Sequence, residues 1–292
     1  MGLFGFNYSK PGPGVDKDAP KKKGIFLYFE LFFRKFWKLI QANMLYFLAS
    51  LPLLVIFAVF APFPAGSIVS ALYAEEELTP ELAANIEIML HLFFSVAAVG
   101  LCGSGPASAS FAYILRCFTR EQHSWIWTDF KEKFKENFKQ GMIVTIVNVV
   151  VLYAGFTAIQ FYYSMHINNV YEMGTLWLFL MALVCMLLVI FVFMHFYIYQ
   201  LMVTFENKTV QLYKNALIFA LAFLPMNVLF AGLFIVLTFI VFTTLTPPFA
   251  ILIAFLLWMG IVRFPIEFYA ARTIQRKILD QQPLSTQNRS EE

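Results

Sequence analysis

The sequence contains few charged side chains. Only 13% of its 292 residues are Asp, Glu, Lys or Arg, about half of the usual share of roughly 25%. Apolar residues make up 60% of the chain, whereas soluble domains contain roughly 45–50%. This chain carries too little charge to cover the surface of a soluble fold of its size. Its composition also excludes a disordered chain, because disorder requires low hydrophobicity with high net charge. The composition therefore predicts a polytopic membrane protein.

Cysteine is also scarce, and its spacing indicates no metal site. Cys102, Cys117 and Cys185 lie in or beside apolar stretches and form no C-x-x-C pair, so we expect them to pack as small apolar residues instead of forming disulfides. The glycine-rich segment lacks both the Lys of a phosphate-binding loop and the strand of a dinucleotide fold. We therefore predict no cofactor and no metal. A net charge of +3 is too small to indicate a nucleic-acid partner.

Long apolar runs are abundant. A hydrocarbon core of about 30 Å requires about 20 apolar residues per helix, and six runs reach that length. They cover residues 39–60, 86–115, 141–163, 175–203, 216–245 and 248–266. The sequence therefore predicts an all-α fold, a polytopic membrane bundle whose six-helix transmembrane domain occupies residues 39–276.

The positions of the cations predict how the bundle is oriented. If the N-terminus is cytoplasmic, all 21 Lys and Arg residues fall in the segments on that side of the six spans. The connections left outside contain no cation and carry five glutamates: Glu75, Glu76, Glu77, Glu81 and Glu172. Cations accumulate in cytoplasmic loops, so we predict a plasma-membrane protein with both termini in the cytoplasm.

Two amphipathic segments are expected on the cytoplasmic side of the bundle. Residues 24–38 (GIFLYFELFFRKFWK) are rich in Phe but end in several cations. This predicts an interfacial helix in contact with anionic lipid, either continuous with the first span or bent from it. Residues 1–23 before it are predicted to be a basic tether, and residues 277–292 a polar tail. Phe4, Phe6 and Tyr8 in the tether could anchor in the membrane or in a partner.

The second amphipathic segment lies between the second and third spans. Asp129 and Glu132 have the spacing of a capping box, while Phe130 and Phe134 recur with Phe138 on one face. We expect a helix over residues 129–140 that lies along the inner membrane surface, with Trp127 at the headgroups. Two interpretations remain open: an interfacial elbow without a partner, or a docking surface for one.

Gly105 and Pro106 lie in the only glycine-rich segment within a predicted span, residues 100–110 (GLCGSGPASAS). Small residues allow helices to approach closely, and Pro106 removes a helical hydrogen bond. Irregular backbone at membrane depth must be covered by protein or water, so we expect this kink to face the bundle interior. It is either a packing notch or a place where a ligand or a moving helix approaches.

Ionisable residues within the predicted spans are too sparse to indicate catalysis. Arg263 and Glu267 are four residues apart, which predicts an ion pair near the inner interface. No span carries a carboxylate at its middle, and neither paired Asp residues nor an H-E-x-x-H motif is found. We therefore expect no enzyme.

Several blocks of the sequence resemble one family. They are GPGVDKDAPKK at residues 12–22, FFRKFWKLIQANMLYFLASLP at residues 32–52, and the longest block, GPASASFAYILRCFTREQHSWIWTDFKEKFKENFKQ, at residues 105–140. The chain is similar to the YesL-like proteins, a family of multi-pass bacterial membrane proteins of unknown biochemical role. Genes of this family often neighbour those for oligosaccharide ABC importers, which implies an association without proving contact. No catalytic residue is implied.

Two functions remain as hypotheses. The first is a non-enzymatic accessory or regulatory subunit that binds another membrane complex, most plausibly a carbohydrate ABC importer. The second is a small-solute transporter or channel whose path passes the kink. The candidate binding residues are Gly105, Pro106, Tyr113, Arg116, Trp127, Asp129, Phe130 and Phe134.

Overall fold

The computed structural model describes residues 24–60, 79–168 and 173–281, and every regular element within them is a helix. The predicted tether, most of the predicted tail and the outer glutamates Glu75, Glu76, Glu77 and Glu172 lie outside these residues. The helices are α1 (Ile25–Phe60), α3 (Pro80–Cys102), α4 (Pro106–Thr119), α5 (Ile126–Glu136), α6 (Phe138–Ile167), α7 (Gly174–Met202), α8 (Thr209–Ala222), α9 (Leu224–Thr244), α10 (Pro247–Ile253), a π-helix (Ala254–Trp258) and α11 (Met259–Lys277).

Six helical segments are long and apolar enough to cross a membrane, which confirms the predicted fold class. They comprise α1, α3, α6, α7, α9 and the continuous run from α10 to α11. The chain is therefore an integral, multi-pass membrane protein.

Three of the predicted span boundaries differ from the structure. The run 86–115 is two helices, because the chain breaks between Cys102 and Pro106. The run 216–245 is also divided, at Phe223, because Pro225 has no amide hydrogen and therefore stands in the first turn of α9. The last run does not end at 266. Its helix continues through Pro265 to Lys277, which brings Glu267 into the span.

The predicted interfacial segment 24–38 is continuous with the first span, which is one of the two arrangements that the sequence allows. It forms the first part of α1, a single helix of 36 residues. Buried Leu27 and Leu31 lie on one face of this part, and Tyr28 contacts the rings of Phe264 and Phe268 on α11. The opposite face exposes Phe33 and Trp37 among others.

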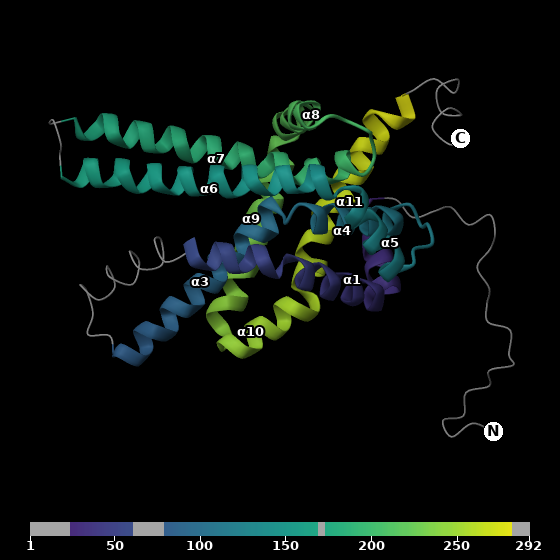
Figure 1. Cartoon of the computed structure of the whole chain (residues 1–292), viewed down its shortest axis with the longest axis horizontal. Coiled ribbons are helices and arrows are strands. Elements are labelled where there is room, and N and C mark those ends of the chain that lie inside the picture. Colours follow the sequence, from purple (N-terminus) through teal and green to yellow (C-terminus); the bar gives the residue numbers. More distant parts are fainter. Residues whose placement is uncertain (1–23, 61–78, 169–172, 282–292) are drawn as a thin grey trace, which may run out of the picture.

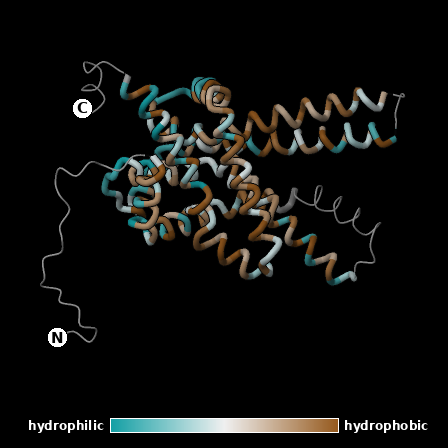
Figure 2. Tube along the Cα trace, turned by 180° about the vertical axis from the view of Figure 1, so that it is seen from behind, coloured by the Kyte–Doolittle hydropathy of each residue, from teal (hydrophilic) through white to brown (hydrophobic). Residues whose placement is uncertain are grey.

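The helices form a compact group from which one hairpin projects. Figure 1 shows α1, α3, α4, α9 and α11 crossing one another, while α6 and α7 lie side by side and extend beyond them. In Figure 2 many of the hydrophilic residues lie toward the end of the molecule that holds the start of α1. The same end holds α5 and the end of α11.

Polar contacts join three segments that are far apart in the sequence. Arg34 of α1 donates to Glu121 at 2.8 Å. Arg120 donates to Gln275 of α11 at 2.6 Å. The start of α1, the turn after α4 and the end of α11 therefore lie together.

Candidate functional site: a buried polar network at a helix break

The break between α3 and α4 is produced by two glycines. Gly103 and Gly105 have φ values of 77° and 60°, in the region where glycine is favoured because it has no Cβ. Pro106 then occupies the first turn of α4, where its missing amide costs nothing. The break leaves carbonyls at the end of α3 and amides at the start of α4 without helical partners.

Side chains from neighbouring helices supply those partners. Ser108 accepts the Ser104 amide at 2.7 Å through its hydroxyl. The Tyr199 hydroxyl on α7 accepts the Gly105 amide at 3.3 Å and donates to the Cys102 carbonyl at 2.7 Å. These hydrogen bonds replace the helical backbone hydrogen bonds that are missing at the break. Few buried polar groups there are therefore left unsatisfied.

Helix α1 contributes two further hydroxyls to the break. Tyr46 donates to the Val99 carbonyl at 3.3 Å and lies 3.1 Å from the Ser108 oxygen. One turn later, the Ser50 hydroxyl lies 2.6 Å from that of Ser104. Both side chains are buried, so α1 is fixed in rotation and depth against the break.

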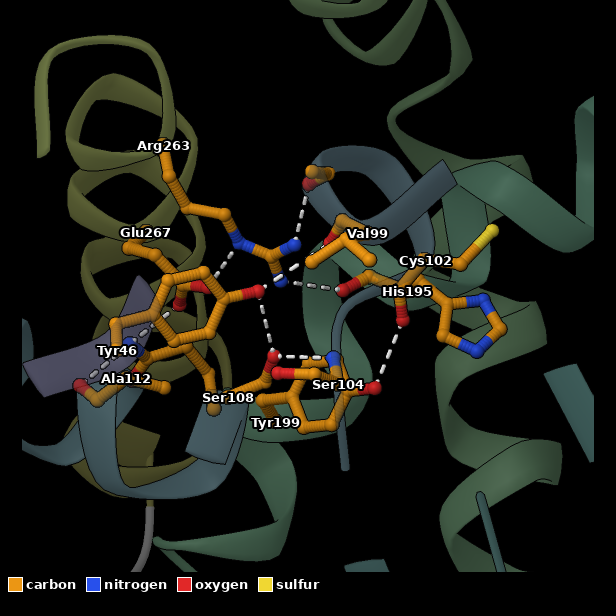
Figure 3. Close-up of polar contacts among 12 residues, drawn as sticks. Tyr46, Val99, Cys102, Ser104, Ser108, Ala112, His195, Tyr199, Arg263 and Glu267 are labelled. Carbon is orange, nitrogen blue, oxygen red and sulfur yellow. Dashed lines mark hydrogen bonds and ion pairs between the residues drawn. The ribbon is translucent and has the colours of Figure 1, made fainter. Parts of the chain in front are cut away.

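Arg263 and Glu267 of α11 form the charged centre of the network (Figure 3). The Arg263 Nε donates to Glu267 at 3.0 Å, and both side chains are 1% exposed. The guanidinium also donates to the Gly100 carbonyl at 2.6 Å and to the His195 carbonyl at 3.3 Å. Gln200 of α7 donates to the other Glu267 oxygen at 2.7 Å.

The ion pair that the sequence predicts is present. It lies in the protein interior, where α3, α7 and α11 meet. Its cation contacts the last turn of α3, where the helix dipole is negative. Three helices are therefore joined through one guanidinium, which identifies the pair as the link between the break and the rest of the bundle.

A second irregularity lies in the last span. The π-helix at residues 254–258 leaves carbonyls with no regular partner, and Asn43 of α1 binds them. Its Nδ2 donates to Ala254 at 3.1 Å and Phe255 at 2.6 Å, while its Oδ1 accepts the Gly260 amide at 2.8 Å. Helix α1 thus satisfies backbone groups at both irregular sites.

Gly105 and Pro106 are therefore buried at the centre of the network. The small residues there permit close contact between helices. A Cβ added to Gly141 of α6 would lie only 2.5 Å from the Pro106 nitrogen. Gly105 and Pro106 serve in this structure as a packing notch between α4 and α6.

The predicted cytoplasmic helix begins earlier than expected. Helix α5 starts at Ile126, so Asp129 lies within its first turn and does not precede it. The Asp129 carboxylate accepts the Trp125 amide at 3.0 Å. Asp129 thus reaches back to the helix start, which is the role that the predicted capping box assigned to Glu132, and the capping box itself was wrong.

Part of the apolar face of α5 packs on the protein. Phe130 is buried and Phe134 is half-buried, with their rings stacked at 6.4 Å. Lys133 lies over the Tyr113 ring of α4 at 5.0 Å, and Arg116 donates to the Val203 carbonyl at 2.6 Å. Of the eight candidate binding residues, only Trp127 is classed as exposed, at 67%.

Sequence reasoning missed Tyr46, Ser50, Ser108 and Tyr199 as members of the network. A hydroxyl on an apolar helix does not by itself indicate its hydrogen-bond partner, because that partner lies up to 97 residues away in the sequence. The available signal was the broken helix at Gly105, which requires partners for its free backbone groups.

The family comparison falls on the region that contains the break. Residues 87–157 match a family described as "Protein of unknown function, DUF624". This range includes most of α3, all of α4 and α5, and the first part of α6. No curated protein and no solved structure matches the chain. The chain is thus a multi-pass membrane protein with a DUF624 domain of unknown function at residues 87–157, as its resemblance to the YesL-like family predicts.

Proposed function

We propose that the protein is a non-enzymatic accessory or regulatory subunit of a membrane complex, with a carbohydrate ABC importer as its partner. The observation that carries this proposal is the outer part of the α6–α7 hairpin, which we call the arm and define as residues 156–167 and 174–192. The buried residues of α6 lie between Gly141 and Gly155, and those of α7 between Phe193 and Met202. The arm therefore has no buried residue of its own.

The length and surface of the arm support a docking role. At 1.5 Å per residue, α6 is about 45 Å long, whereas a hydrocarbon core is about 30 Å thick. One face of α6 carries a shallow depression in which Thr157 lies between the rings of Tyr153, one turn before it, and Phe161, one turn after it. A small residue between large ones suits the close approach of another helix.

The interior of the bundle supports a subunit over a carrier. The buried ion pair Arg263–Glu267 is engaged by backbone carbonyls and Gln200. A cavity beside the break, next to Tyr46 and Ser50, holds about 10 Å³, which is room for at most one water molecule. The importer is chosen as the partner because the YesL-like resemblance implies an association with sugar importers.

The arm can be tested by copurification from native membranes. We expect Thr157→Trp, which fills the depression on α6, to reduce the recovered importer subunits at least tenfold compared with the unsubstituted chain. The matched control is Ile251→Trp, which adds the same ring at an exposed site on α10 and should leave recovery unchanged. Quantitative mass spectrometry of affinity-purified complexes provides the measurement. Failure of the unsubstituted chain to recover any stoichiometric membrane partner would contradict the accessory role.

The proposed orientation has its own test. With both termini cytoplasmic, a membrane-impermeant maleimide should not label Cys introduced at Lys131 or Lys214 in intact cells, but should label Cys introduced at Glu81. All three sites are exposed on the protein, so burial does not protect them. A background in which Cys102, Cys117 and Cys185 are replaced by Ala removes native thiols. Labelling of the position 131 or 214 variants before lysis would refute the orientation.

A further inference from the structure

Helix α5 turns one aromatic and two basic side chains away from the protein. The buried residues of this helix are Ile126 and Phe130, which identify the side that meets the bundle. Trp127 lies on the exposed side, and Lys131 and Lys135 follow it at intervals of four residues. Residues four apart lie on one face of a helix, and all three are exposed. We call Trp127, Lys131 and Lys135 the outer stripe of α5.

The outer stripe leads into the face of α6 that points away from the bundle. Only Asn137 separates the two helices, and its carbonyl accepts the Gly141 amide at 2.8 Å, as in a continuous helix. Exposed apolar residues then recur every four positions on α6, at Phe138, Met142 and Ile146. Because α6 is one of the membrane-spanning helices, these residues face lipid. The outer stripe therefore lies at the end of a lipid-facing surface, where we expect the headgroups.

The charged side chains of α5 are separated by sign around the helix axis. Glu132 and Glu136 form the row of residues next to the outer stripe, and Glu136 binds Lys133. The outer stripe itself contains no anion. Within the part of the chain that the structure describes, neither of its lysines forms an ion pair. The outer stripe thus presents two unpaired ammonium groups beside an indole ring.

We propose that the outer stripe binds the phosphate groups of anionic phospholipids in the membrane that α6 crosses. Indole rings are favoured at headgroup depth, and a lysine there extends its ammonium group toward phosphate. Anionic lipid is favoured over zwitterionic lipid because its phosphate charge is not offset by a cation in the same headgroup. An acidic segment of a soluble protein has the same charge, but it would not explain the continuity with the lipid-facing surface of α6.

This proposal assigns the headgroup contact of α5 to a row of residues different from the one that its sequence indicates. The sequence places the phenylalanine row of this helix on the membrane surface. In the structure Phe130 is buried in the protein, which leaves the outer stripe as the row available to headgroups. The proposal does not depend on the accessory role proposed above.

The test measures the fluorescence of Trp127 in the full chain, reconstituted into vesicles of phosphatidylcholine with one-fifth phosphatidylglycerol. Bromine on the upper part of a lipid chain quenches a nearby indole. It is placed either on the phosphatidylglycerol or on an equal amount of the phosphatidylcholine. The quenching that is lost in Trp127→Phe is the share of Trp127. We expect this share to be at least threefold larger with the brominated phosphatidylglycerol than with the brominated phosphatidylcholine.

Two double variants locate the source of the preference. Lys131→Gln combined with Lys135→Gln removes both ammonium groups of the outer stripe and should make the two quenching values equal. Arg276→Gln combined with Lys277→Gln removes the same number of charges from exposed positions at the end of α11, and should keep the threefold difference. All four substitutions are at exposed sites, where a change of side chain has little effect on folding.

The other results would overturn the proposal in distinct ways. Equal quenching by the two brominated lipids in the unsubstituted chain would show that anionic lipid is not selected. Quenching by aqueous iodide but by neither lipid would show that the outer stripe faces water, and would favour an acidic protein segment as its partner. A preference that survives the double lysine variant would belong to other cations. Recovery of importer subunits has no bearing on these results, so the two proposals fail independently.

Discussion

Replacing Arg263 with Met is expected to lower the free energy of unfolding by about 3–5 kcal/mol. Breaking a buried pair leaves an uncompensated charge in a medium of low dielectric constant, and Glu267 is 1% exposed. The substitution also removes the donors to the Gly100 and His195 carbonyls. Unfolding in detergent micelles, followed by the loss of helical circular dichroism, provides the measurement.

Two further variants test whether the loss of stability comes from leaving one buried charge without its partner. Arg263→Met combined with Glu267→Met should recover part of the loss, because replacing both charges of a buried pair by apolar groups is often tolerated. Lys133→Met removes the cation of the Lys133–Glu136 pair at the surface of α5, and should cost less than about 1 kcal/mol. Arg263→Met costing no more than Lys133→Met would refute the structural role of the buried pair.

The sequence predicted the membrane bundle and ended its last span too early for the same reason. Apolar runs locate spans reliably because lipid cannot satisfy free polar groups, and all six spans were found in this way. The predicted last span includes Arg263 and ends at residue 266, just before the second charge, Glu267. In the structure Arg263 and Glu267 neutralise each other at i and i+4, so the helix continues past them to Lys277.

The face of α5 shows a second limit of sequence reasoning. The spacing of Phe130 and Phe134 correctly indicates an amphipathic helix, but periodicity does not say whether lipid or protein covers the apolar face. In the structure α4 covers it. The contacts of Asn43 with the π-helix span more than 200 residues, so no local pattern could have predicted them. Whether a neighbouring helix or the bilayer covers a side chain depends on tertiary packing.

The largest backbone effect is expected for Gly105→Ala. Gly105 has φ 60° and ψ −115°, a region that is strained for any residue with a Cβ, at a cost of roughly 1–3 kcal/mol. The added Cβ would also overlap the Gly141 carbonyl and the Thr145 hydroxyl of α6. Overpacking adds roughly 1–3 kcal/mol, and a backbone carbonyl cannot move aside as a flexible side chain can. We expect a total loss of about 3 kcal/mol or more in the free energy of unfolding.

Gly232→Ala is the matched control because the same methyl group is added to a glycine with open space around it. In a helix interior Ala is favoured over Gly by about 0.5–1 kcal/mol, so this variant should be as stable as the unsubstituted chain or slightly more stable. The sign of the change thus depends on position. If both variants shift the unfolding midpoint equally, the α3–α4 break is not held by contact with α6. If only Gly105→Ala unfolds early, the close approach of the two backbones holds the break.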